Sequence, residues 1–348
     1  MPKVSIVSTV CRPGGIDILL AGMRDQTFKD FEVILVDRRY ERRHARVMEM
    51  AEQYGVDLVH VPEHRRNGKW VGFASAWNTG FALAQGEYVL MLVDWSYAPP
   101  TWIEKHLAVL EGKRRYAFGP YRFLELPALI LKKEFDFESI KWGEFDRCVD
   151  TNEVLDGHVF DEVDVFMDGR FDPAWIPQLT STYTKDLRLN YGESARSNVD
   201  EGWLHIKNDS VTRSVLEELD GLDERLERGR GPLDIDLQIR LTVGRVETYW
   251  DPELYIWYMD PHSITQGYPW GGKSKRIEGR WSWNDGLGYA DRRKVELSFG
   301  APITAKNKQR LSVLSEKLAA WRDPKFVCPI NDVTDLEYWG CEMWPDTP

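Results

Sequence analysis

The first hundred residues alternate between short apolar runs rich in β-branched side chains and segments whose apolar residues recur at helical spacing. Four of the runs are predicted as strands, at residues 4–10, 31–36, 58–61 and 88–93. Runs this short and this apolar are typical of strands that are buried on both faces. Because predicted strands alternate with predicted helices, the pattern predicts an α/β fold with a mostly parallel central sheet and helices on both faces.

Polar residues follow three of these runs directly. Thr9, Asp37 and Asp94 stand where strands of the predicted sheet end. Ligands of open α/β sheets bind in the crevice beyond the carboxyl ends of the strands. We therefore expect a ligand site at this edge, with the Asp94 carboxylate open to it although its strand is buried. The alternative is that Asp94 caps a helix that starts near Pro100 or Thr101.

Composition and charge exclude some classes of protein. The formal net charge of −11 argues against a protein that coats nucleic acid or anionic membranes without specificity. The four cysteines are far apart, which suggests neither a zinc site nor a disulfide framework and favours a reducing compartment. No apolar run approaches the roughly 18 residues of a membrane span. We expect a cytoplasmic protein without a membrane span.

Regular patterns return in the second half of the chain after an irregular stretch that we interpret as sheet edge and long loops. Helices are predicted from about Ser210 to Leu219 and over 233–241, with Asp234 near the start of the second. Short strand-like pieces at 247–250 and 254–258 follow, and a last helix is predicted near 306–321.

Several segments resemble, in order and spacing, the motifs of the family 2 glycosyltransferases, which have the GT-A fold. The segments are VSIVSTVCRP, QTFKDFEVILVDRR, ASAWNTGFALAQGEYVLMLVDWS and VLEELDGLDERLERGRGPLDIDLQIRL. The resemblance covers roughly residues 3–110 and 203–262. It implies a Rossmann-like nucleotide-diphospho-sugar transferase fold. The implied organisation is a catalytic domain at 1–265, with a nucleotide-sugar half at 1–113 and an acceptor and catalytic-base half at 114–265, and a C-terminal extension at 266–348.

The resemblance also implies site residues. Residues that would line the nucleotide-sugar donor are Thr9, Cys11, Arg12, Asp37, Asn78 and Asp94. Asp94 stands where the metal-binding Asp-x-Asp of the family begins, and His262 falls near a histidine that some members add to the metal. The implied cofactor is Mn²⁺ or Mg²⁺, since carboxylate oxygens suit these cations. Asp234 matches the family's general base, and Asp236 is left open as the alternative.

The chain departs from the family pattern where the diphosphate is expected. The Asp-x-Asp becomes Asp94-Trp95-Ser96, and an arginine that often meets phosphate becomes Trp77. Weak metal binding, or partial replacement of the metal by Arg and Lys side chains, follows from these changes. The Gly-, Trp- and Lys/Arg-rich stretch at 266–283 is predicted to be a basic lid, in which Lys273 and Arg276 contact the donor. The alternative is an exposed glycine-rich turn.

Two functions of different classes remain open at this point. The leading one is an inverting glycosyltransferase that moves a sugar from a UDP-sugar to a hydroxyl of a glycan, small molecule or phosphorylated acceptor. The basic cluster that begins at Arg38 also leaves a nucleic-acid acceptor open. The other function is a non-catalytic sugar- or nucleotide-binding protein on a degenerate glycosyltransferase fold. Retention of Asp234 favours the enzyme. A nucleotidyltransferase would need a glycine-rich loop with a basic residue after the first strand, and residues 11–15 resemble such a loop only weakly. The sequence leaves the oligomeric state open.

Overall fold

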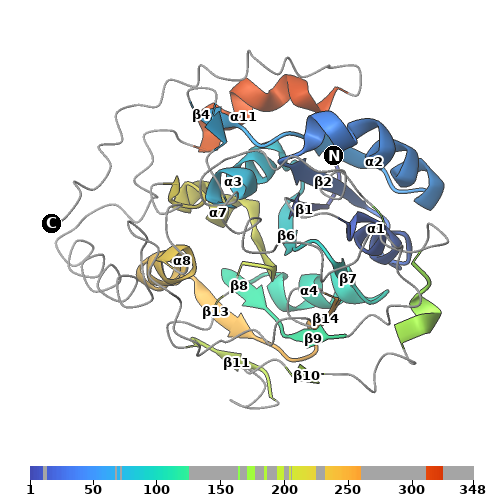
Figure 1. The fold of residues 1–348 in the computed structure, drawn as a ribbon. Helices are drawn as coiled ribbons and strands as arrows, with labels where there is room; N and C mark the ends of the chain where they lie inside the picture. Colours follow the sequence, from blue (N-terminus) through green and yellow to red (C-terminus); the bar gives the residue numbers. More distant parts are fainter. Residues whose placement is uncertain are drawn as a thin grey trace, which may run out of the picture.

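The computed structural model of the chain describes twelve stretches, drawn in colour in Figure 1: residues 1–10, 14–66, 69–70, 73–124, 164, 171–176, 184–185, 194–199, 204, 206–224, 232–259 and 311–323. The elements of the first half are β1 (Val4–Val10), α1 (Ile16–Arg24), β2 (Phe31–Asp37), α2 (Tyr40–Tyr54), β3 (Leu58–Val61), β4 (Arg65–Arg66), β5 (Lys69–Trp70), α3 (Phe73–Leu83), β6 (Tyr88–Leu92), β7 (Ser96–Tyr97), α4 (Trp102–Leu110), β8 (Arg115–Phe118) and β9 (Tyr121–Phe123). The later elements are β10 (Thr184–Lys185), β11 (Arg196–Ser197), β12 (Asn208–Thr212), α7 (Arg213–Leu219), α8 (Pro232–Val243), β13 (Glu247–Trp250), β14 (Ile256–Tyr258) and α11 (Leu311–Leu318), with short 3₁₀ helices at Pro173–Trp175 and Ala319–Arg322.

The large central sheet has the strand order β11-β13-β8-β12-β6-β1-β2-β3. Strands β6, β1, β2 and β3 are parallel neighbours, and β13 is parallel to β8. The predicted α/β class with a mostly parallel sheet is therefore confirmed. One element was predicted wrongly, because Ser210–Thr212 belongs to strand β12 and the helix α7 begins only at Arg213. Strand β12 runs antiparallel between β6 and β8.

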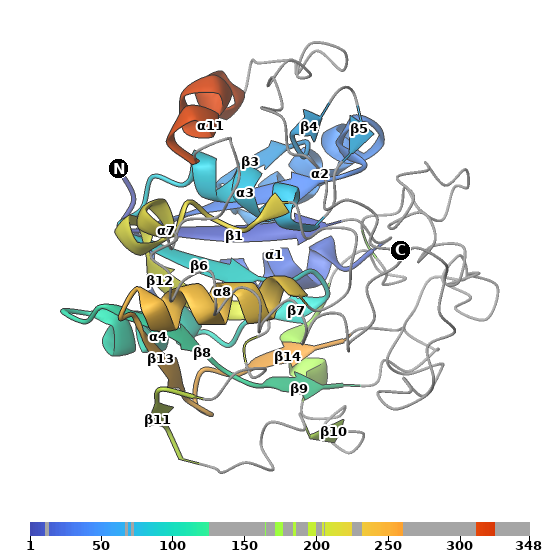
Figure 2. The same ribbon diagram turned by 90° about the vertical axis from the view of Figure 1, so that its left-hand side faces the viewer.

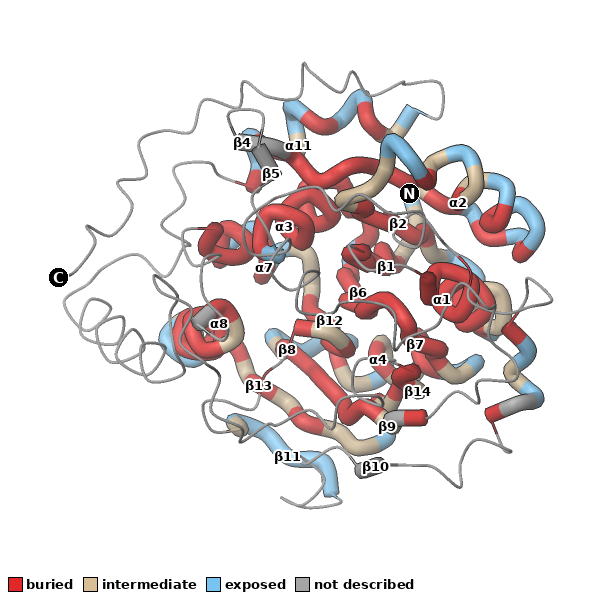
Figure 3. The backbone as a smooth tube through the Cα atoms, viewed as in Figure 1, coloured by how far each residue is buried: buried red, intermediate tan, exposed pale blue. Residues whose placement is uncertain are grey.

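Side chains alternate between the two faces of this sheet and feed two apolar layers. In β1, for example, Ile6 packs into one layer and Val7 into the other. Helices α1, α2 and α4 cover the first face, and α3, α7, α8 and α11 cover the second (Figures 1 and 2). The parallel strands β1, β2, β3 and β6 lie between the two helical layers and are almost wholly buried (Figure 3). This double burial explains why their sequences are continuous apolar runs.

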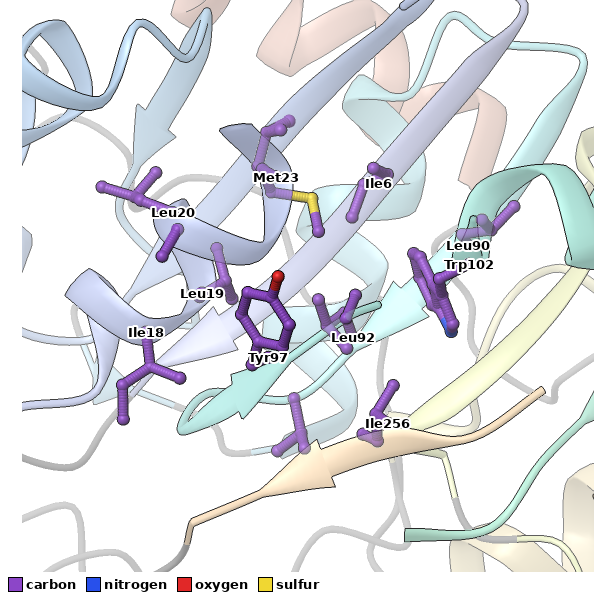
Figure 4. Close-up of a cluster of buried hydrophobic side chains, with 14 of the residues drawn as sticks. Ile6, Ile18, Leu19, Leu20, Met23, Leu90, Leu92, Tyr97, Trp102 and Ile256 are labelled. Atoms are coloured by element: carbon purple, nitrogen blue, oxygen red, sulfur yellow. The ribbon is translucent and has the colours of Figure 1, made fainter. Parts of the chain in front are cut away.

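The first apolar layer joins helix α1 to the sheet (Figure 4). Leu19 and Met23 of α1 and Leu92 of β6 lie in one buried cluster together with Tyr97, which follows β6 in the chain. Each of these side chains is at most 4% exposed, so the turn between β6 and β7 is tied to the core. The chain beyond β6 therefore leaves the sheet in a well-defined direction.

A second, smaller sheet continues beyond the ends of β6 and β8. Its order is β10-β9-β14-β7. Strand β14 pairs antiparallel with β7, so that Tyr258 lies opposite Ser96, and parallel with β9. The backbone N–H of Met259 also donates to the carbonyl of Trp95, at 2.9 Å. The short Asp94–Ser96 turn is thus held between the two sheets.

Helix α11 packs on the second face of the large sheet, over α3 (Figure 1). Ser315 donates to the carbonyl of Ala82 at 2.6 Å, and the backbone N–H of Leu311 donates to Asp220. Arg322 donates to the carbonyl of Leu83. This C-terminal helix is therefore bonded both to α3 and to the end of α7. In the part of the chain that is described, no helix is long and apolar enough to cross a membrane.

Candidate active site

Strands β1, β2 and β6 are parallel, so their carboxyl ends meet at one edge of the sheet. Thr9 pairs in register with Val36, and Asp37 follows on the neighbouring strand. Asp94 comes two residues after the end of β6. The structure thus brings Thr9, Asp37 and Asp94 to the same edge, as predicted from the sequence. Cys11 and Arg12 lie outside the described residues.

The turn after β6 is closely packed. Asp94 is 2% exposed, so the expectation that its carboxylate is open to the edge of the sheet is wrong for this structure. Trp95 has a left-handed backbone with φ of 59°. The Trp95 ring lies against Gly15, where a β-carbon would come within 2.6 Å of it. Only glycine therefore fits at the start of α1. The N-cap residue of α4 is Thr101, so the alternative in which Asp94 caps that helix is wrong.

A divalent-cation site beside Asp94 would need further ligands from the surrounding residues. Mg²⁺ and Mn²⁺ require several oxygen or nitrogen ligands around one point. Among the residues that the structure describes, no three His, Cys, Asp or Glu side chains are grouped so that they could hold a metal ion. Ser96 directs its hydroxyl to the backbone carbonyl of Asp94, at 3.4 Å. The described residues therefore do not form a metal site by themselves, and His262 lies outside them.

A two-residue segment connects the Asp94 turn to helix α8. The carbonyl of Lys207 accepts a hydrogen bond from the N–H of Val93 at 2.9 Å, one residue before Asp94. The N–H of Ile206 donates to Oδ1 of Asp234 at 3.3 Å, in the first turn of α8. Asp94 and Asp234 are therefore brought to the same edge of the sheet through adjacent residues.

The two aspartates at the start of α8 have different surroundings. Asp234 is partly exposed. Asp236 is fully buried, and its carboxylate accepts from Nε of Arg240 at 2.7 Å. Arg240 also donates to the carbonyls of Leu219 and Gly221 at 2.7 and 3.0 Å. An acceptor would have to displace this buried ion pair to reach Asp236, so the geometry favours Asp234 as the base.

Asn78 of α3 holds the turn that follows α7. Its amide donates to the carbonyl of Leu222 at 2.9 Å and to Glu224 at 2.8 Å, and it accepts from the N–H of Leu222 at 2.8 Å. A β-carbon on Gly221 would come within 2.3 Å of its oxygen. These contacts make Asn78 an anchor for the chain that leads to α8, and its role in donor binding stays a prediction.

Sequence reasoning missed two members of this buried network. His64 lies 3.3 Å from Glu224 through Nε2 and 2.7 Å from the Thr79 hydroxyl through Nδ1. All three side chains are at most 4% exposed. His64 and Glu224 are 160 positions apart, so no local pattern connects them. Together they link the end of β3, helix α3 and the turn before α8.

Asp37 ends β2 inside a charged cluster. Its Oδ1 accepts from the N–H of Arg39 at 2.8 Å and lies 3.5 Å from Arg43, while Oδ2 lies 3.5 Å from Nε2 of His60. Burial raises the pKa of the Asp37 carboxyl, but Arg43 and His60 outweigh it and the pKa is lowered overall. Nδ1 of His60 is 3.0 Å from Nδ1 of His44. Asp37 is therefore ionised and enclosed by protein groups.

Lys273 and Arg276, and the whole predicted lid, lie outside the described residues. The same holds for the predicted metal ligand His262. The structure therefore tests neither the lid nor the roles of Lys273, Arg276 and His262, and these stay predictions.

Comparison with known proteins agrees with this geometry. Residues 6–172 match the family described as Glycosyl transferase family 2. This part of the chain is therefore similar to glycosyltransferase family 2 domains. A search of curated proteins found no match.

Among solved structures, similar folds occur in glycosyltransferases. A structure of GalNAc-T7 with UDP, GalNAc and Mn²⁺ is 12% identical, covers 92% of this chain and 55% of its own, and has a TM-score of 0.50. The mannosyltransferase PcManGT from Pyrobaculum calidifontis, in complex with GDP-Man and Mn²⁺, is 16% identical to this chain. The match covers 77% of this chain and 59% of the PcManGT chain, with a TM-score of 0.45. Residues 1–349 of S. aureus TarS are 14% identical to this chain. The match covers 75% of this chain and 62% of the TarS chain, with a TM-score of 0.41. This chain spans less than two thirds of each, and the fold is that of the GT-A glycosyltransferases.

Proposed function

We propose that this protein is an inverting glycosyltransferase that moves a sugar from a nucleotide-sugar donor, a UDP-sugar, to an acceptor hydroxyl. One observation carries the proposal. Ile206 and Lys207 join the end of β6, where Asp94 stands, to the first turn of α8, where Asp234 stands. A carboxylate for the acceptor and the strand end expected to meet the donor therefore belong to one edge of the sheet, whose strands β1, β2, β3 and β6 lie almost entirely in the part of the chain that matches the Glycosyl transferase family 2.

The proposed reaction is a single displacement. The acceptor oxygen forms a bond to the anomeric carbon while the bond from that carbon to the diphosphate oxygen breaks, and the diphosphate leaves with the electron pair. The hydroxyl proton passes to the carboxylate of Asp234, which is partly exposed and lies at the edge of the sheet. Attack on the face opposite the leaving group inverts the anomeric configuration.

Donor recognition follows the residues that line the edge. Thr9 is proposed to meet the nucleoside, and Cys11 and Arg12 extend this proposal beyond the described residues. Asp37 was expected to contact the donor, but it is fully buried among protein groups, so we assign it the role of holding the end of β2 in place. The acceptor is proposed to be a hydroxyl of a glycan, a small molecule or a phosphorylated compound. The wide spacing of the cysteines supports a reducing, cytoplasmic environment.

The test is a donor screen followed by a turnover assay. Thermal shift with UDP-, GDP-, ADP- and dTDP-sugars identifies the nucleotide, because a ligand at about 100 times its Kd stabilises a protein by about 2.7 kcal/mol. Release of the nucleoside diphosphate is then measured over a set of acceptors, with Mn²⁺, with Mg²⁺ and with EDTA. The anomeric configuration of the product is read by NMR. A retained configuration would contradict the mechanism.

A second candidate is a sugar- or nucleotide-binding protein without activity. The observation that favours it is Ser96, which replaces a carboxylate of the family pattern and whose hydroxyl is turned to the backbone of Asp94. This candidate expects saturable nucleotide-sugar binding without any release of nucleoside diphosphate. The turnover assay therefore separates it from the enzyme.

A further inference from the structure

Lys207 is a cation at the edge of the sheet that the proposed reaction does not yet use. It directly precedes β12, whose first residue, Asn208, lies opposite Leu92 near the end of β6. Because β12 is antiparallel to β6, the residue before β12 lies at the end where β6 leaves the sheet. The hydrogen bond from Val93 to the Lys207 carbonyl confirms this position.

Two tyrosine rings hold the side chain of Lys207. Its Nζ is 5.8 Å from the centroid of the Tyr121 ring and 5.9 Å from that of the Tyr258 ring. Both distances are within the range in which an ammonium group is attracted to the face of an aromatic ring. Tyr258 is the residue that pairs with Ser96 across β14 and β7. The ammonium group is thus placed beside the strand that carries Ser96.

Several carboxylates lie at this edge of the sheet, so an anionic ligand that binds there needs a cation beside it. Asp94 stands one residue from Val93, Asp234 accepts from Ile206, and Asp209 accepts from the N–H of Lys207 at 2.7 Å. A diphosphate that approaches these carboxylates is repelled unless positive charge is placed among them. Lysine provides a compact point charge that commonly binds phosphate.

We propose that the ammonium group of Lys207 binds the diphosphate of the nucleotide-sugar donor at the Asp94–Ser96 turn. It meets the negative charge that grows on the leaving oxygen as the bond to the sugar breaks. Lys207 thereby supplies positive charge at a point where Ser96 replaces a carboxylate. This inference rests on the proposed function.

The experiment measures binding of UDP and of uridine to the full chain by calorimetry in EDTA. Lys207→Met keeps the apolar stem against the tyrosine rings and removes the charge, and Lys207→Arg keeps the charge. Lys105→Gln is the matched control. That lysine also lies over a tyrosine ring, at 5.6 Å from Tyr255, but it is on α4 and pairs with Glu253. Thermal unfolding checks that each variant is folded.

The expected result is a loss specific to the diphosphate. Lys207→Met should weaken UDP binding about tenfold and leave uridine binding unchanged, since only UDP carries the charge that Lys207 meets. Lys207→Arg and Lys105→Gln should bind UDP within about threefold of the natural protein. The difference between Lys207→Met and the natural protein should shrink as salt is raised.

Two failures are distinguishable. If the natural protein binds UDP and Lys207→Met binds it equally well, the role of Lys207 is wrong and the proposed function stands. If the natural protein binds none of UDP, GDP, ADP and dTDP, the proposed function fails and the role of Lys207 fails with it. Should Lys207→Met not fold, Lys207→Gln is measured in its place, and the same two outcomes apply.

Discussion

The end of β2 and the start of α8 each present an aspartate at the edge of the central sheet, but the two carboxylates are held in different ways. Asp37 is fully buried and contacts a backbone N–H, Arg43 and His60. Asp234 is partly exposed and accepts from the N–H of Ile206. The first arrangement keeps a charge in place inside the protein, and the second leaves a carboxylate where a substrate can reach it.

The surroundings of an aspartate that follows a strand or begins a helix indicate which role its carboxylate has. Enclosure by protein cations indicates that a carboxylate organises its neighbours, as Asp236 does with Arg240 only two residues from Asp234. Partial exposure at a sheet edge indicates a carboxylate that is able to exchange a proton with a ligand.

The largest expected effect is on turnover. Asp234→Asn should lower kcat by about 10²–10⁴-fold, because it removes the base while keeping the shape of the side chain. The Kd for UDP and the thermal midpoint should stay close to those of the natural protein. Single-turnover kinetics and calorimetry measure these quantities. Full activity in Asp234→Asn would show that another carboxylate is the base and that the exposure of Asp234 has no part in catalysis.

The next effect is on stability, at Arg240. Arg240→Met should lower the free energy of unfolding by about 3–5 kcal/mol, because Asp236 would be left as a buried charge without its cation. The double variant with Asp236→Leu should recover much of the loss. Urea unfolding checks both. Equal losses in the single and double variants would show that Arg240 acts through the Leu219 and Gly221 carbonyls and not through Asp236.

Asp37→Asn should lower stability by about 1.5–3 kcal/mol at pH 7, the range of hydrogen bonds to charged groups. The pKa of Asp37 is lowered in the fold, so its contribution is present above the unfolded pKa and is lost as pH falls through the folded pKa. The gap between the natural protein and Asp37→Asn should therefore close below about pH 4. Unfolding in urea from pH 7 down to pH 3.5 measures it, and a gap that does not change with pH would contradict the ionised state of Asp37.

The smallest effect concerns His44, which stacks on His60 behind Asp37. Burial, together with the charge of His60, lowers the pKa of the His44 imidazole. The folded state then binds fewer protons than the unfolded state, so stability falls as pH drops below about 6.5. His44→Gln should flatten this fall by less than about 1 kcal/mol, since the side chain is partly exposed. An unchanged slope between pH 7 and pH 5.5 would contradict the assignment.

The central strands could be predicted because they are buried on both faces. The runs in β1, β2, β3 and β6 are continuous and apolar, and their predicted bounds agree with the structure to within one residue. Helix α8 was predicted from the spacing of its leucines. In these elements the local pattern and the packing demand the same residues.

Strand β12 was missed because its sequence, NDSVT, is mostly polar although it lies in the middle of the sheet. Two of its polar side chains, Asn208 and Ser210, have hydrogen-bond partners far away in the chain. Asn208 accepts from Trp102 at 2.9 Å and donates to the carbonyl of Leu254 at 2.6 Å, and Ser210 contacts His106 at 2.7 Å. Buried polar groups with such partners are compatible with a core strand, but no local pattern shows them.

The candidate site was predictable only in part, for the same reason. Asp94 and Asp234 were found by resemblance to family motifs. The His64–Glu224 contact and the place of Lys207 depend on strand order, which the antiparallel insertion of β12 determines. Where a residue matches no motif, its position depends on strand order and on the register between strands. Neither of these can be predicted from local sequence patterns.

Helix α11 has a consequence for how the molecule unfolds. Its first residue is bonded to Asp220 at the end of α7, and Ser315 of α11 and Arg322 of the 3₁₀ helix that follows are bonded to the end of α3. Strand β12 joins the part of the sheet formed by β6, β1, β2 and β3 to the part formed by β8, β13 and β11. Helix α11 connects α3 to the end of α7 on the outside of the sheet. We expect amide protons of β1 and β12 to exchange with solvent only in a single cooperative opening, in step with those of α11. Neither half is then expected to be an independent folding unit, because residues 311–322 contact elements that pack on both of them.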